Sequence, residues 1–154
     1  MPNLYPEGYE NEVITEADLT AEKTIGYRNG IAFDYATGDF KRDGMNKIMD
    51  SDGIQSWKDW CINCLQTERY KHLAYSTDFG IELDAAMNAR SQEEAEAILS
   101  RQITEALMAD PYKRTDYVSD ITYYWPAPDT VSVDVTIHGV ADVTIDITAY
   151  LTRK

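Results

Sequence analysis

The chain has 154 residues, a hydrophobic fraction of 44 % and a formal net charge of -13, which fits one folded domain with a sizeable core. Because it is so acidic and has no basic stripe, we expect no nucleic-acid partner. It has no apolar run of the roughly 18 residues that a membrane span needs, and its N-terminus (MPNLYPEGYENEV) lacks the features of a signal peptide. We therefore expect the protein to fold in a cytoplasm with both cysteines reduced.

Residues 1–30 make up the first segment, with six acids, two bases and several prolines and glycines. Such a segment buries too little apolar surface to order itself alone. Its apolar residues, among them Tyr5, Tyr9 and Val13, are spaced like anchors. Two interpretations stay open: an arm lying on the domain or a neighbour, or a disordered tail. We expect residues 1–30 to be an extended or disordered acidic arm and residues 31–154 to be a single domain.

The segment after the arm predicts a short hairpin, with residues 31–35 and 40–42 joined by a turn at 37–39. Met45, Ile48 and Met49 favour one or two helical turns, followed by a capping turn at residues 50–53. A longer helix then places its apolar side chains three or four apart on one face. These are Ile54, Trp57, Cys61, Cys64 and Leu65.

Two more helices are expected in the middle of the chain, the first of them a short one at residues 82–89. The second begins after Ser91, and Glu94 stands at the spacing of a capping box. Its apolar stripe predicts a buried face, and Pro111 ends it. The stripe consists of Ala95, Ile98, Leu99, Ile103, Ala106 and Leu107.

The C-terminal third predicts β-structure, beginning with a strand at residues 117–125. Residues 131–138 and 143–148 then alternate apolar with polar side chains around a turn at 139–142, as in a hairpin with one face buried. The fold class is therefore α+β: a small antiparallel sheet with a C-terminal β-hairpin packed against two or three helices, and an extended N-terminal arm.

Several catalytic or metal-binding chemistries are disfavoured by the placement of the candidate residues. Cys61 and Cys64 form a CxxC pair, but on the buried face of a helix rather than at its start, so we expect inert thiols. His72 and His138 lack ligand spacing relative to that pair, so no zinc site is expected. The DSDG turn at residues 50–53 lacks the closing glutamate of a calcium loop.

Cys64 to Leu83 (CLQTERYKHLAYSTDFGIEL) resembles the sheath-initiator, or wedge, proteins in the baseplates of contractile phage tails. The resemblance extends over about residues 27–151 and is strongest to the branch found in Gram-positive prophages and PBSX-type particles. Where the family carries Glu-Pro-Arg, this chain has Asp110-Pro111-Tyr112-Lys113-Arg114, so Asp replaces Glu and the arginine comes two residues later. The matching positions are Leu65, Thr67, Glu68, Arg69, Tyr75, Phe79 and Gly80.

The resemblance implies a structural baseplate protein, not an enzyme, with no cofactor and no metal. It would join wedge proteins to the tail tube and sheath and nucleate sheath assembly by β-strand addition. It would be assembled in the bacterial cytoplasm and then reside in a virion or phage-like particle. Its implied partners are other wedge proteins, the sheath subunit, and tube or hub proteins, with neither nucleic acid nor membrane.

The residues expected to bind partners fall into three groups. A loop corner is expected at Thr67, Glu68 and Arg69, and a wedge contact is expected at Asp110, Pro111 and Arg114. The hairpin is expected to recruit the sheath through an unpaired edge, whose aspartates would favour a basic incoming segment. The alternative is that the hairpin is central in the sheet and fully covered. Its apolar positions are Val131, Val133, Val135, Ile145 and Ile147.

Two other functions stay open. A peptidoglycan-degrading, lysozyme-like hydrolase would use two carboxylates, of which Glu68 is the best single candidate. The structural alternative for Glu68 is an ion pair with the adjacent Arg69. A small adaptor unrelated to phages would bind a host partner.

Overall fold

The computed structural model describes residues 26–153, so the arm predicted for residues 1–30 lies almost wholly outside the described residues. Four two-residue strands come first: β1 (Gly30–Ile31), β2 (Phe33–Asp34), β3 (Asp39–Phe40) and β4 (Asp50–Ser51). Three helices follow: α2 (Gly53–Gln66), α3 (Leu83–Met87) and α4 (Gln92–Met108). The chain ends with β5 (Thr115–Ala127), β6 (Thr130–Gly139) and β7 (Thr144–Thr152).

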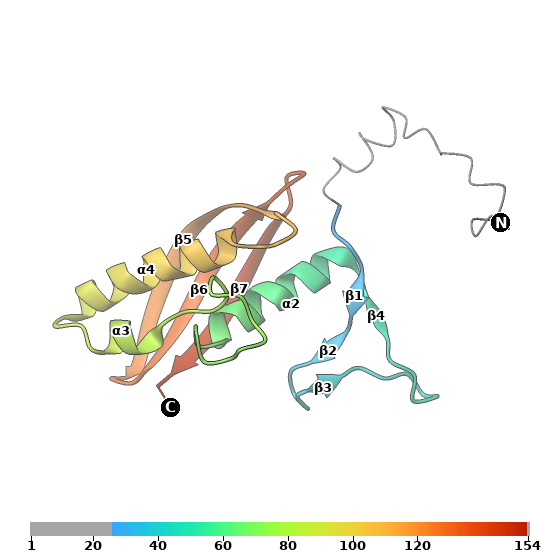
Figure 1. Ribbon diagram of the computed structural model, residues 1–154, viewed down its shortest axis with the longest axis horizontal. Coiled ribbons are helices and arrows are strands. Elements are labelled where there is room, and N and C mark those ends of the chain that lie inside the picture. Colours follow the sequence, from blue (N-terminus) through green and yellow to red (C-terminus); the bar gives the residue numbers. More distant parts are fainter. Residues whose placement is uncertain (1–25, 154) are drawn as a thin grey trace, which may run out of the picture.

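The last three strands form an antiparallel sheet in the order β5-β6-β7, and α2 and α4 lie across one of its faces (Figure 1). The predicted hairpin is therefore confirmed as β6 and β7, and the α+β class is confirmed as well. The core lies between this sheet and the helices. Apolar side chains from β6 and β7 meet those of α2 and α4 there, and they are almost completely buried.

Helix α2 begins at the predicted capping turn, where the Asp52 carboxylate accepts a 2.8 Å hydrogen bond from the Gln55 N–H. Its predicted face is buried at Trp57, Cys61, Cys64 and Leu65. The prediction was wrong for Ile54, which lies in the first turn of α2 and is 42 % exposed.

The Trp57 ring shows why this helix lies so close to the sheet. Its indole N–H donates to the Thr115 Oγ1 at 3.2 Å, and its ring lies against Gly139. A Cβ at Gly139 would come within 2.6 Å of the Trp57 ring and 2.2 Å of the Tyr27 hydroxyl. Tyr27 itself packs on Trp57 with ring centroids 5.3 Å apart, so the domain core includes a residue from the range assigned to the arm.

Helix α4 follows the predicted pattern. The Ser91 hydroxyl accepts from the Glu94 N–H at 3.2 Å, while the Glu94 carboxylate accepts from the Arg90 N–H at 2.9 Å. This arrangement resembles a capping box, except that the Glu94 carboxylate accepts from the N–H of the residue before the N-cap and not from that of the N-cap itself. The predicted stripe is buried except for Ile98, which is partly buried against the same core.

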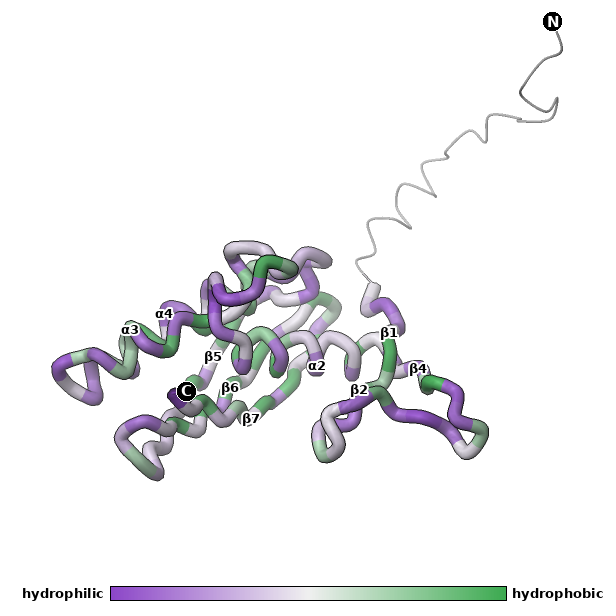
Figure 2. The backbone as a smooth tube through the Cα atoms, turned by 60° about the horizontal axis from the view of Figure 1, so that its bottom comes forward, coloured by the Kyte–Doolittle hydropathy of each residue, from purple (hydrophilic) through white to green (hydrophobic). Residues whose placement is uncertain are grey.

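Residues 30–51 form a ribbon that projects from the N-terminal end of α2 (Figures 1 and 2). β1 pairs with β4 and β2 pairs with β3, so the predicted hairpin is confirmed. The helical turns predicted at residues 45–49 are wrong. The Asp43 carboxylate accepts from the Met45 and Lys47 N–H groups, both at 2.9 Å, and this tight turn replaces a helix.

Candidate functional site

The hairpin residues predicted to bind partners face the core rather than solvent. Val131, Val133, Val135, Ile145 and Ile147 are all buried, with at most 8 % exposure. The polar residues that alternate with them form the open face of the sheet. Any contact that this hairpin makes with a partner therefore involves its open face or its backbone edge, with the apolar residues holding the hairpin in place.

Among residues 26–153, one edge of the hairpin is paired with another strand, and the other edge is not. β6 pairs on one side with β5 and on the other with β7. Within residues 26–153, no strand pairs with the outer side of β7. β7 therefore presents a row of backbone N–H and C=O groups along an edge of the sheet.

The register identifies the backbone groups on that edge. The Gly139 N–H donates to the Val143 C=O at 2.7 Å, so this is a hydrogen-bonded pair of the ladder. Since such pairs alternate with non-bonded pairs in an antiparallel ladder, the odd-numbered residues of β7 bond to β6. The N–H and C=O groups of Thr144, Asp146, Thr148 and Tyr150 consequently point outward.

The opposite edge of the sheet, at β5, is irregular. Its pairing with β6 shifts register three times, between Thr115 and Tyr117, between Ser119 and Thr122, and between Tyr124 and Ala127. Asp120 has a positive φ of 46° within one of these bulges, and Pro126 lacks an N–H. Bulges and proline are the usual means by which a strand edge is made unsuitable for pairing, so β7 is the better template.

The open face beside β7 is acidic and rich in hydroxyl groups. The Thr136 hydroxyl donates to Asp146 at 2.6 Å, and the Thr148 hydroxyl donates to Asp134. Residues 115–152 contain six aspartates and no lysine or arginine. Basic side chains on an incoming segment would favour its binding along this acidic face.

The predicted loop corner is held together by backbone bonds. The Arg69 N–H donates to the Ile81 C=O and the Ile81 N–H to the Thr67 C=O, both at 3.0 Å. The Arg69 side chain then reaches the Gly80 C=O at 2.9 Å. Gly80 has φ of +92°, and a Cβ there would lie 2.6 Å from the Thr67 oxygen, so only glycine fits this position.

The ion pair with Arg69 that was considered as an alternative role for Glu68 is not formed. The ion-pair partner of Glu68 is Lys71, three residues on, while the nearest carboxylate to the Arg69 guanidinium belongs to Glu105, at 4.0 Å. The side chain of Arg69 turns inward to the Gly80 carbonyl, which leaves Glu68 to the flexible lysine on the surface.

Glu68 lines a groove of about 540 Å³ that continues from the end of β7, where Tyr150, Leu151 and Thr152 form one wall. Glu68 is the single carboxylate among the described residues in its lining. The pair of acids that glycoside hydrolysis uses is therefore not assembled in this groove.

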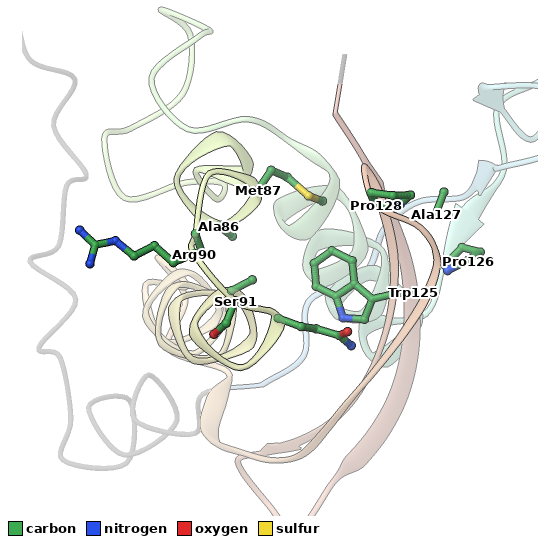
Figure 3. A pocket seen from close by; sticks show the side chains of 11 residues that line it. Ala86, Met87, Arg90, Ser91, Trp125, Pro126, Ala127 and Pro128 are labelled. Atoms are coloured by element: carbon green, nitrogen blue, oxygen red, sulfur yellow. The ribbon is translucent and has the colours of Figure 1, made fainter.

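A second hollow, of about 500 Å³, lies between the α3–α4 turn and the β5–β6 turn. Figure 3 shows Trp125 and Met87 pointing toward one another there, while Arg90 points away. The Trp125 indole N–H donates to Glu96 at 3.0 Å. The described lining contains no carboxylate, so it does not suit the hydrolase chemistry either.

The predicted wedge contact contains a buried ion pair. The Arg114 Nε donates to the Asp110 Oδ2 at 2.8 Å and its Nη2 to the Oδ1 at 3.0 Å, a bidentate arrangement. Both residues are at most 5 % exposed. The structure therefore brings Asp110 and Arg114 together inside the loop, and leaves Pro111 between them on the surface.

Sequence reasoning missed the aromatic residues of this corner. Tyr112, 54 % exposed, has the Arg114 guanidinium 5.2 Å from its ring centroid and the Arg28 guanidinium at 5.5 Å. Arg114 also lies 5.8 Å from the centre of the Trp60 ring. The spacing of Asp110 and Arg114, four residues apart beyond a helix end, is the one signal that could have predicted their pairing.

The two cysteines lie within the core, as expected. Cys61 and Cys64 are free thiols with no exposed surface. Burial raises the pKa of both, that of Cys64 to about 11, so the reactive thiolate is disfavoured. In the part of the chain that is described, no three His, Cys, Asp or Glu residues gather as a metal site. No helix there is long and apolar enough to cross a bilayer.

Comparison with known proteins identifies the family. No curated protein sequence matches the chain. A family model described as the contractile injection system sheath initiator matches residues 29–141, which is more than half of the chain. The match ends before β7, whereas the resemblance was expected to run to about residue 151. The chain belongs to the sheath-initiator family of contractile injection systems.

Proposed function

We propose that this protein joins the baseplate wedge to the sheath and starts sheath assembly by accepting a strand of the first sheath subunit on β7. Family membership makes it a structural component of a contractile injection system, of the kind found in phage tails. The proposal adds the mechanism, the two attachment points and the partners at each.

The observation that carries the proposal is the unequal pair of sheet edges. β7 offers outward backbone groups along an unbroken strand, whereas β5 is interrupted by three register shifts. Strand addition obtains its affinity from main-chain hydrogen bonds, so it needs an edge of the first kind. The groove at the end of β7, lined by Thr67 and Glu68, would define where the added strand stops.

The chemistry of the sheet also describes the incoming strand. Side chains that continue the buried face would be apolar, because their neighbours on β7 are Ile145, Ile147 and Leu151. Side chains on the open face would include lysine or arginine, because Asp134 and Asp146 lie there and the sheet contains no lysine or arginine.

The wedge attachment would lie at the corner after α4. The buried Asp110–Arg114 pair holds the loop, and Pro111 and Tyr112 are presented on its surface. In this proposal Asp110 and Arg114 act by shaping the contact, and the exposed residues between them touch the wedge protein. We further propose that residues 1–30 strap onto a neighbouring protein and that residues 31–154 are the wedge domain.

A proline in β7 tests the mechanism. The Thr148 N–H points away from β6, so Thr148→Pro removes a donor from the outer edge without breaking a bond of the β6–β7 ladder. Particles carrying this variant should form baseplates without sheath, as seen by electron microscopy. Thr148→Ala, which loses the hydroxyl but keeps the N–H, should give normal sheaths. Normal sheaths on Thr148→Pro particles would refute the mechanism.

A further inference from the structure

A third hollow lies beside the corner after α4, and one of its walls is aromatic. Trp60 comes from α2, and Tyr75 and Phe79 come from the loop that follows this helix. The Trp60 and Phe79 ring centroids are 5.8 Å apart at 65°, and those of Tyr75 and Phe79 are 4.5 Å apart at 32°. Pro111 and Ala109, beyond the end of α4, also line the hollow.

The size of the hollow suits one side chain. It encloses about 340 Å³, at the lower end of the range for ligand sites in proteins. Because Tyr75 is 52 % exposed, the hollow opens to the surface next to the proposed wedge contact. A side chain projecting from a docked protein would therefore reach it.

The charge of the lining favours a cation. Aromatic faces carry negative partial charge, and they attract ammonium and guanidinium groups that lie within about 6 Å of the ring centre. Asp78 adds a carboxylate to the lining, and no lysine, arginine or histidine lines the hollow among the described residues. Within residues 26–153, no hydrogen bond or ion pair engages the Asp78 side chain. The net charge of -13 attracts a basic partner over a longer range.

Two arginine side chains of the chain itself already contact aromatic rings at this corner. Arg114 lies 5.8 Å from the Trp60 centroid, and Arg28 lies 5.5 Å from that of Tyr112. The Asp110 carboxylate holds the Arg114 side chain in place, so Arg114 does not turn to fill the hollow. Of these two rings only Trp60 lines the hollow, and the Asp110 carboxylate balances the charge of the Arg114 guanidinium beside it, so Arg114 does not oppose a second cation there.

We propose that the hollow between Trp60, Tyr75, Phe79 and Pro111 is a socket for one arginine or lysine side chain of a baseplate partner. The proposal rests on the proposed function only for the nature of that partner. The cation would lie against the aromatic wall with Asp78 as its counter-charge. An uncharged side chain of the same shape would bind far less well.

The test uses the full chain and an arginine analogue, N-acetyl-arginine methylamide, followed by NMR at the tryptophan indole N–H signals. The Trp60 signal should shift and saturate, with a dissociation constant on the order of 10 mM. The matching citrulline compound, equal in shape and uncharged, should give little shift. Trp57, which is fully buried, and Trp125, which lines another hollow, are internal controls whose signals should stay in place.

Two variants complete the test. Tyr75→Ala and Asp78→Asn should each weaken binding about threefold to tenfold. Tyr124→Ala, which removes an exposed tyrosine from the far side of the sheet, should leave binding unchanged. Equal shifts with the citrulline compound, no saturable shift of Trp60, or unchanged binding in both variants would overturn the socket.

Failure here is distinguishable from failure of the proposed function. Thr148→Pro reports on sheath growth at β7, whereas the arginine analogue reports on the isolated chain. An unresponsive Trp60 signal with sheathless Thr148→Pro particles overturns the socket alone. Normal sheaths on those particles, with arginine binding intact, overturn strand addition alone.

Discussion

At the scale of single residues, one glycine and one buried ion pair shape the two loop corners that are proposed to contact partners. Gly80 adopts a backbone conformation that other residues rarely take, with the Thr67 carbonyl against the place where a Cβ would be. Asp110 and Arg114 satisfy each other in a buried bidentate pair. Such a pair adds little net stability, but removing one partner leaves an uncompensated charge. Both features shape loops and do not offer side chains to solvent.

Gly80→Ala should destabilise the protein by about 2 kcal/mol or more, because it combines a positive φ with a backbone clash. The free energy of unfolding from urea denaturation measures the effect. Gly44→Ala is the matched control, since no atom lies within 4 Å of its Cβ position. It should change stability by less than about 1 kcal/mol. Equal effects for both variants would contradict the assigned role of Gly80.

At the scale of elements, β7 differs from the strands beside it. β6 is bonded on both sides and β5 is interrupted by bulges, whereas β7 is regular and bonded on one side. Helix α2 packs over β7, so the strand is held firmly by its buried face. A firm strand with one open edge is pre-ordered for pairing, which lowers the entropy lost on adding another strand.

Hydrogen exchange should alternate along β7 in the isolated protein. The Ile145 and Ile147 amides bond to β6 and should exchange slowly, whereas the Asp146 and Thr148 amides point outward and should exchange quickly. In assembled particles the outward amides should become protected. Uniform protection along β7 in the isolated chain would show that the edge is already covered.

At the scale of the whole molecule, charge and burial are unevenly distributed. Residues 115–152 contain six aspartates and no lysine or arginine, while the two thiols of α2 are buried in the core and Tyr27 and Tyr123 pack against it. Burial raises the pKa of Cys61, Cys64, Tyr27 and Tyr123. In each case the folded state retains the proton that the unfolded state releases at lower pH.

The raised thiol pKa values predict a loss of stability in alkali. A group whose folded pKa is raised contributes stability that is complete below its unfolded pKa, here the ordinary thiol value of 9.0. That contribution falls as the pH rises toward the folded value, about 11 for Cys64. Between these values the free energy of unfolding should fall by up to about 1.4 kcal/mol per pH unit for each thiol.

Urea denaturation across this pH range measures the slope. The variant with both Cys61→Ala and Cys64→Ala should be less stable at neutral pH and show a flatter alkaline slope. A slope that is the same in the two proteins would contradict the assignment to the thiols.

Local sequence patterns determined the elements. Helical spacing predicted α2 and α4 together with their caps, and alternation predicted β6 and β7, because burial of one face imposes a period on neighbouring residues. The Thr67–Gly80 pattern indicated the family that the comparison then showed. The turn at residues 43–47 escaped prediction because Met45, Ile48 and Met49 also fit a helical period.

The tertiary structure alone decided which strand lies at the edge of the sheet and which side chains line the hollows. A strand shows the same alternation of apolar and polar side chains whether it is central in a sheet or at its edge. Only the pairing of β6 with β5 therefore shows that β7 is the outer strand. Likewise, only the fold brings Trp60, Tyr75 and Phe79 together and places Arg114 against Asp110. The physical reason is that periodicity is a property of neighbours along the chain, whereas edges and hollows depend on contacts between distant segments.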